Sequence, residues 1–213
     1  MVVSQPQQIL IDTWVKATWD KFLAVTNSSD YQDSRAYFDA GYMRIEMAAL
    51  GAGHGRQNAV ALKVADIFAA LHDIRIIEFL NCSFRQVGER ECQPDVAFYI
   101  GEGFQLPPQN NAPINIELFG PPTLAIEIGA SSLSDDLGTK RLLYERLGVQ
   151  EYWVVDVNAQ QVIAFSIAEG RSGQIQVSEV LPGLKMSLVE EAMVRSQTED
   201  DSAITRWLMQ TLG

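Results

Sequence analysis

Three ionisable residues lie in or beside predicted apolar strands or on the helix that follows them. Asp95 lies between Pro94 and the apolar run VAFYI. Glu127 lies inside the apolar run LAIEIG, and Lys140 lies on the next predicted helix. A carboxylate inside a hydrophobic strand is unfavourable unless it is paired or binds a metal. Glu127 therefore needs an explanation that surface glutamates do not.

Together these residue types point to phosphodiester chemistry. Two carboxylates that lie side by side repel each other, and a hard divalent cation such as Mg²⁺ relieves that repulsion. A nearby lysine can stabilise negative charge that develops on a phosphate or orient a water. Each residue also has a simpler explanation, because Pro-Asp is a common turn dipeptide, a strand glutamate can pair with a cation, and helix lysines are usually solvated.

The surrounding pattern predicts the elements that must position these residues. A helix is expected over 54–72, after the Gly-rich loop GAGHG, because its apolar residues recur every three or four positions. A second helix is expected over 134–147, opened by Ser134 and closed by Gly148. We also expect a helix over 18–26, a hairpin over 34–49 that turns at Asp39-Ala40-Gly41, a proline-rich loop over 101–122, strands over 74–80, 83–87, 95–100, 123–129, 151–157, 161–167 and 175–179, and one or two helices after Leu188.

This order of elements predicts an α/β fold with a mixed β-sheet flanked by α-helices. The chain has 213 residues, of which 47% are hydrophobic and 20% charged, so it can bury one substantial core. We expect a mobile N-terminal segment over 1–17, one domain over 18–195 and a C-terminal helical extension over 196–213. No apolar run reaches the roughly 18 residues of a membrane span and no signal peptide is evident, which favours a cytoplasmic protein without a membrane partner.

The net charge of −11 argues at first against a nucleic-acid partner, because non-specific DNA binders usually carry a basic surplus. Five cations on the two long predicted helices could still form a local basic rim: Arg56, Lys63, Lys140, Arg141 and Arg146. Cys82 and Cys92 lack metal-site spacing and are expected to be reduced thiols.

A histidine and three serines near the starts of the predicted helices each allow two interpretations. His54 could contact a phosphate or could be a helix cap or surface residue. Ser131, Ser132 and Ser134 could receive phosphate oxygens, although simple N-capping explains them as well.

The run PDVAFYI followed by LAIEIGASSLSDDLGTKRLLYERLGVQEYWVVDV resembles the Uma2-type family of putative restriction endonucleases, a branch of the PD-(D/E)XK nuclease superfamily. The resemblance extends over residues 18–190 and includes AGYMRIEMAALGAGHGRQN upstream. It implies a restriction-endonuclease-like core and a DNA-cleaving enzyme.

The resemblance also implies roles for individual residues. Asp95 and Glu127 would be metal ligands, joined by the backbone carbonyl of Ile128. In the superfamily's basic form a lysine stands two residues after the second acid, where this chain has Gly129, so Lys140 would supply the lysine from the following helix. Two more residues are implied in supporting roles: Tyr144, which would hold Lys140 or contact substrate, and Glu46, an auxiliary acid.

We therefore expect an Mg²⁺- or Mn²⁺-dependent endonuclease that cleaves DNA. It would contact the phosphate backbone, act as a homodimer, and need no small-molecule cofactor; Asp95, Glu127, Lys140 and Glu46 would be catalytic, and His54, Tyr144 and Ser131 would contact substrate. A noncatalytic interaction protein that keeps the nuclease fold, and a hydrolase acting on RNA or another phosphoester, are the alternatives.

Overall fold

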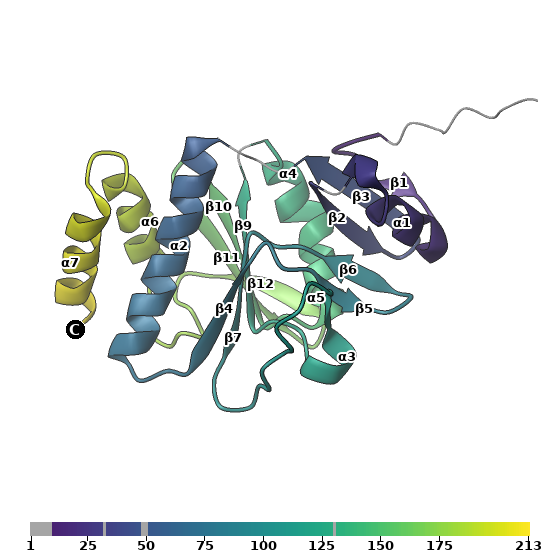
Figure 1. Ribbon diagram of the computed structural model, residues 1–213. Coiled ribbons are helices and arrows are strands. Elements are labelled where there is room, and N and C mark those ends of the chain that lie inside the picture. Colours follow the sequence, from purple (N-terminus) through teal and green to yellow (C-terminus); the bar gives the residue numbers. More distant parts are fainter. Residues whose placement is uncertain (1–9, 32, 48–50, 130) are drawn as a thin grey trace, which may run out of the picture.

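The computed structural model describes residues 10–31, 33–47, 51–129 and 131–213, and it contains two six-stranded sheets with helices around them (Figure 1). The predicted fold class, α/β with a mixed sheet flanked by helices, is confirmed, although the strands divide between two sheets rather than one. No helix in the described part of the chain is both long and apolar enough to span a membrane.

The larger sheet carries the candidate catalytic strands. Its strand order is β12-β11-β10-β9-β7-β4, and all neighbours are antiparallel except β9 and β10. That parallel pair requires a crossover connection, which the helical segment between them supplies. The strands are β4 (Ile76–Leu80), β7 (Val96–Ile100), β9 (Leu124–Gly129), β10 (Glu151–Asp156), β11 (Gln161–Ala168) and β12 (Arg171–Ile175).

The smaller sheet has the order β1-β3-β2-β6-β5-β8. Its hairpin turns at Ala40 and Gly41, both at positive φ, as the sequence predicts. Helix α1 (Trp19–Thr26) covers the outer face, where Phe22 packs on Phe38 with ring centroids 5.2 Å apart. The strands are β1 (Val15–Lys16), β2 (Ser34–Asp39), β3 (Tyr42–Met47), β5 (Phe84–Gln86), β6 (Arg90–Cys92) and β8 (Ile114–Asn115).

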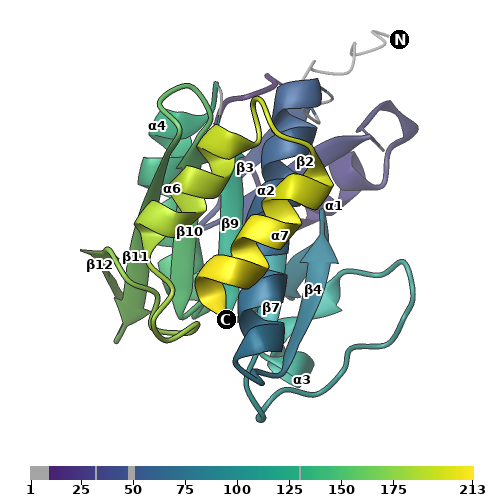
Figure 2. The ribbon, with the colours of Figure 1, turned by 90° about the vertical axis from the view of Figure 1, so that its left-hand side faces the viewer.

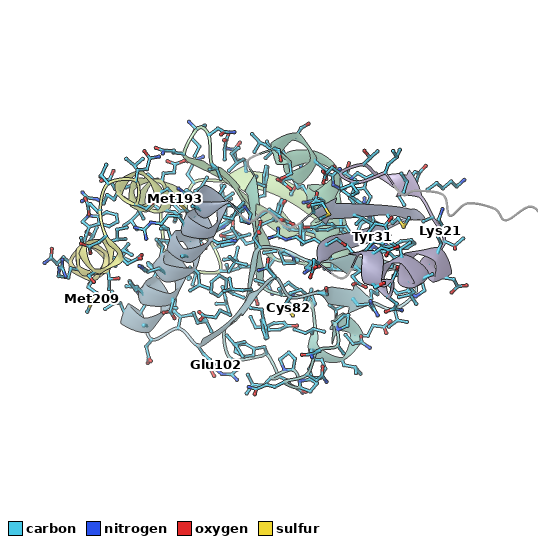
Figure 3. All side chains as sticks on the ribbon, turned by 45° about the horizontal axis from the view of Figure 1, so that its top comes forward. Lys21, Tyr31, Cys82, Glu102, Met193 and Met209 are labelled. Atoms are coloured by element: carbon cyan, nitrogen blue, oxygen red, sulfur yellow. The ribbon has the colours of Figure 1, made fainter. Side chains whose placement is uncertain are left out.

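Three helices lie on one side of the larger sheet (Figure 2): α2 (Ala52–Leu71), α6 (Met186–Arg195) and α7 (Asp201–Leu212). The fully buried Trp153 and Leu208 belong to the core that these helices share with the sheet. In Figure 3, Met193 of α6 lies on this helical side and Lys21 of α1 lies at the opposite side. The C-terminal helix therefore contributes to the main core.

The other face of the larger sheet packs against the smaller sheet and a broken helix. That helix consists of α4 (Leu133–Asp135), the π-helical turn η2 (Asp136–Lys140) and α5 (Arg141–Leu147). Tyr144 stacks on Tyr152 with ring centroids 4.6 Å apart. Because side chains alternate along a strand, Ile126 faces the α2 side and Glu127 faces this second core.

Several predicted boundaries are wrong for local reasons. The GAGHG segment is not a loop, because α2 begins at Ala52 and Gly55 N–H already donates to Gly51. The helix predicted over 134–147 is opened by Ser132, not Ser134. The last predicted strand, 175–179, is found four residues earlier, because Glu169 and Gly170 both take positive φ and form a two-residue hairpin turn.

The proline-rich segment over 101–122 is not wholly irregular. It contains β8, which pairs with β5, and the short helix α3 (Ile116–Phe119). Residues 1–9 of the segment predicted to be mobile, and residues 48–49 of the predicted hairpin, lie outside the described residues.

Candidate active site

Asp95 and Glu127 meet where β7 pairs with β9. Val96 pairs with Ile126, so the antiparallel register places Asp95 opposite Glu127 one step beyond the last paired residues. Opposite residues of an antiparallel pair point to the same face. Both residues are 1% exposed, so the two carboxylates share one buried location.

Asp95 is held by three groups. Oδ1 lies 2.8 Å from Nε2 of His54 and forms an ion pair with the guanidinium of Arg35, while Oδ2 accepts the backbone N–H of Ile128 at 2.7 Å. Burial disfavours the charged form of Asp95, but the His54 hydrogen bond and the Arg35 charge outweigh it, so the pKa of Asp95 falls below its ordinary value. Asp95 is therefore ionised in the folded protein.

Glu127 has hydroxyl partners rather than a close cation. Oε1 accepts the hydroxyl of Tyr144 at 2.7 Å and that of Tyr37 at 3.1 Å, and Nζ of Lys140 is 3.9 Å from Oε2. Burial raises the pKa of Glu127 well above its ordinary value; Lys140 opposes the rise and the charge of Asp95 adds to it. The charge on Glu127 is thus poorly compensated.

Lys140 reaches the same place from the π-helical turn. Its Nζ is 2.9 Å from Glu46 Oε2 and 2.9 Å from Asp136 Oδ1, and it lies 4.3 Å from the centre of the Tyr37 ring. Burial alone would lower the pKa of Lys140, but Glu127 and the two close carboxylates raise it above its ordinary value. Lys140 is therefore a buried, charged ammonium group, not the solvated helix lysine of the simpler interpretation.

These side chains line a cavity of about 220 Å³. A water takes up about 30 Å³ of the liquid, so the cavity has room for a hydrated ion and several waters. The wall consists of Asp12, Arg35, Arg44, Glu46, Met47, His54, Asp95, Glu127, Ile128, Ser131, Ser132 and Lys140.

The structure brings together the residues predicted for the site, and all of them except Tyr144 line the cavity. Tyr144 is fully buried and contacts Glu127 through its hydroxyl. Ser131 is exposed at the rim, and Ser132 Oγ donates to Asp136 Oδ2 at 2.6 Å. His54 lies in the first turn of α2, whose N-cap is Gly51, and is 9% exposed, so it is neither the helix cap nor a surface residue.

Three residues of the site were not predicted: Arg35, Arg44 and Asp136. Arg44 Nε lies 2.5 Å from Oε1 of Glu46, two residues along β3, and Arg35 shares a face of β2 with Tyr37. The alternation along these two strands was the available signal, because it places cations on the face that carries Tyr37 and Glu46.

The predicted basic rim does not form. Arg56 and Lys63 both pair with Asp201, Arg146 pairs with Asp39, and Lys140 is buried. Arg141, the fifth member, donates to Ser172 Oγ at 3.0 Å. The positive charges of the two helices are thus used mainly within the protein.

The residues present suit a hard divalent cation. Within the described ranges no three His, Cys, Asp or Glu side chains are grouped so as to hold a metal ion. Mg²⁺, however, is usually held by one or two carboxylates and several waters, which Asp95, Glu127 and a cavity of this size can provide. The guanidinium of Arg35 against Asp95 marks the position as one that favours positive charge.

Comparison with known proteins agrees with this architecture. A crystal structure of a putative nuclease of the DUF820 family from Anabaena variabilis ATCC 29413 matches with a TM-score of 0.57 and 17% identity, covering 83% of this chain and 98% of that one. No curated protein matches the sequence. The family model named Uma2, putative restriction endonuclease, matches residues 19–199. The chain therefore belongs to the Uma2 family of putative restriction endonucleases.

Proposed function

We propose that this nuclease-family protein is a divalent-metal-dependent endonuclease that hydrolyses DNA phosphodiester bonds, with a site of the PD-(D/E)XK type. One observation carries the proposal: two buried carboxylates, one directly before β7 and one on the adjacent β9, share a cavity with a buried, charged lysine. In this site Asp95, Glu127 and the carbonyl of Ile128 would hold Mg²⁺ or Mn²⁺. The bound ion would polarise the phosphoryl group and lower the pKa of a water.

The protein's own groups have separate tasks in this proposal. Lys140 would stabilise the charge that develops on the phosphate, and Glu46 keeps its ammonium group in the cavity. His54 holds Asp95 in place, and Ser131 at the rim would contact a phosphate oxygen. Tyr144 keeps the Glu127 carboxylate oriented.

Charge explains why a cation is needed for substrate binding. Among the residues that line the cavity, the four acids Asp12, Glu46, Asp95 and Glu127 outnumber the three bases Arg35, Arg44 and Lys140. A phosphate would be repelled by this excess, and a divalent ion would reverse it. We therefore expect weak, salt-sensitive DNA binding that requires the metal.

Cleavage of supercoiled plasmid DNA in Mg²⁺ or Mn²⁺ tests the proposal. Asp95→Asn and Glu127→Gln should lower the rate at least about 100-fold. Asp156→Asn is the matched control, because Asp156 accepts turn N–H groups at the end of β10 and does not line the cavity. Equal cleavage by wild type and Asp95→Asn would mean that the activity belongs to a contaminant. Parallel reactions with RNA of the same sequence separate DNA cleavage from an RNA-directed activity.

A noncatalytic interaction protein is the second candidate, and the pairing of Asp95 with Arg35 favours it. If Arg35 permanently compensates Asp95, no divalent ion should raise the melting temperature, and Glu127→Gln should leave stability unchanged or increase it. A metal-dependent rise that Asp95→Asn abolishes would reject this candidate.

The proposed function includes assembly into a homodimer. Cleaving both strands of a duplex in one binding event would use two sites, for which a homodimer is the simplest arrangement. Light scattering of the purified protein with and without DNA measures it.

A further inference from the structure

Gly129 occupies the position two residues after Glu127, at the end of β9. It pairs with Asp156 in the parallel ladder, and its φ lies outside the left-handed region that favours glycine. Backbone conformation therefore does not require glycine here, and another cause must be sought.

The cause is space. A Cβ on residue 129 would lie 2.8 Å from Oδ2 of Asp136 and 3.3 Å from Cα of Leu133. The first distance is shorter than real Cβ contacts, and the second involves backbone that cannot rotate away. Any side chain at this position, including a lysine, would have to displace Asp136.

Asp136 cannot easily move. Its carboxylate is fully buried, accepts Ser132 Oγ at 2.6 Å and lies 2.9 Å from Lys140 Nζ. Its backbone carbonyl accepts the hydroxyl of Tyr152 at 3.0 Å, which fixes the π-helical turn from the adjacent sheet. Such turns are rare and often occur at functional sites.

Asp136 does not line the cavity, although its partner Lys140 does. Lys140 and Glu46 form part of the cavity wall, whereas Asp136 does not. Asp136 thus contacts the ammonium group without being part of the cavity wall.

We infer that Asp136 is a positioning residue for Lys140, and that Gly129, Asp136 and Lys140 form one unit. The carboxylate of Asp136 fills the space of a side chain at position 129 and fixes the lysine that enters from the following helix. The packing part of this inference is independent of activity, while its catalytic consequence rests on the proposed nuclease function.

A stability cycle tests the packing part without DNA or metal. Gly129→Ala should lower the melting temperature by about 4–8 °C in the wild-type background, and by less than half as much in an Asp136→Ser background, where the colliding oxygen is withdrawn. Equal losses in both backgrounds would overturn the inference. If Asp136→Ser does not fold, Asp136→Ala replaces it in the same cycle.

Kinetics test the catalytic part. Asp136→Ala should lower kcat at least about tenfold with KM and Mn²⁺ affinity unchanged, Asp136→Asn should recover part of the loss, and Asp136→Ala should have no further effect in a Lys140→Ala background. A further loss in that background would show that Asp136 acts independently of Lys140 and would overturn the positioning role. If the wild type cleaves no nucleic acid, the proposed function fails while the stability cycle still decides the packing unit.

Discussion

Replacement of Arg35 by glutamine should lower the stability of the metal-free protein and raise its affinity for a divalent cation. Arg35 is 8% exposed, pairs with Asp95 Oδ1 and donates to Asn81 Oδ1 at 2.9 Å. A metal that binds Asp95 must displace this guanidinium or tolerate its charge. The variant removes the competitor but leaves the bonds from His54 and the Ile128 N–H to Asp95.

The expected magnitudes follow from the burial of the pair. Removing one partner of a buried ion pair costs about 3–5 kcal/mol, which is about 6–20 °C of melting temperature for a chain of this size. Two unit charges 4 Å apart interact by about 4 kcal/mol at an effective dielectric constant of 20. Allowing for solvent and side-chain motion, loss of the Arg35 charge should tighten metal binding at least about tenfold, or about 1.4 kcal/mol.

Thermal unfolding in EDTA and across an Mn²⁺ titration measures both effects. For wild type, metal at about 100 times its Kd adds about 2.7 kcal/mol, and Arg35→Gln should gain more at the same concentration. Arg85→Gln is the matched control, because Arg85 pairs with the buried Glu91 outside this cavity. If Arg35→Gln binds Mn²⁺ more weakly than wild type, or if both variants respond equally, Arg35 does not compete with a metal at Asp95.

Three further predictions concern stability, measured by chemical denaturation without metal. Tyr144→Phe should cost about 2 kcal/mol, because it leaves Oε1 of the buried Glu127 without its closest donor. Tyr99→Phe should cost about 1 kcal/mol, because the Tyr99 hydroxyl donates to a partly buried backbone carbonyl. Equal costs would contradict the greater importance of the buried hydrogen bond to Glu127. Burial raises the pKa of Glu91, so the folded state binds its proton more tightly than the unfolded state does. Stability should therefore fall as pH rises from about 4.5 through the folded pKa, by about 1.4 kcal/mol for each pH unit that separates the folded and unfolded pKa values. The Glu91→Gln variant should lack this fall. A variant with the same pH profile as wild type would contradict this role of Glu91. Leu208→Ala should cost about 2–5 kcal/mol because Leu208 is fully buried in the main core, whereas a cost under about 1 kcal/mol would make α7 a dispensable appendage.

The parts of the fold that could be predicted are mostly those set by patterns among residues close in sequence. The apolar stripe of α2 and the alternation of the β2–β3 hairpin depend on residues close in sequence, and both are found as predicted. The division into two sheets could not be predicted, because β1 and β8 have two residues each and show no period. Their assignment depends on pairing with distant strands.

The same distinction applies to the site. Asp95, Glu127 and Lys140 were conspicuous because each is a charge in or beside an apolar element. Arg35 and Asp136 gave no such signal, since an arginine on a strand and an aspartate in the first turns of a helix are ordinary. Their importance arises from the packing of the smaller sheet and the π-helical turn against β9, which brings Arg35 to Asp95 and Asp136 to Gly129.

A crystal structure of the protein soaked in Mn²⁺ would show whether Asp95 and Glu127 hold a metal ion together. We predict an anomalous peak in the cavity coordinated by both carboxylates, with the guanidinium of Arg35 withdrawn from Asp95. No manganese between these carboxylates at saturating concentration, with Arg35 still paired to Asp95, would contradict the proposed metal site.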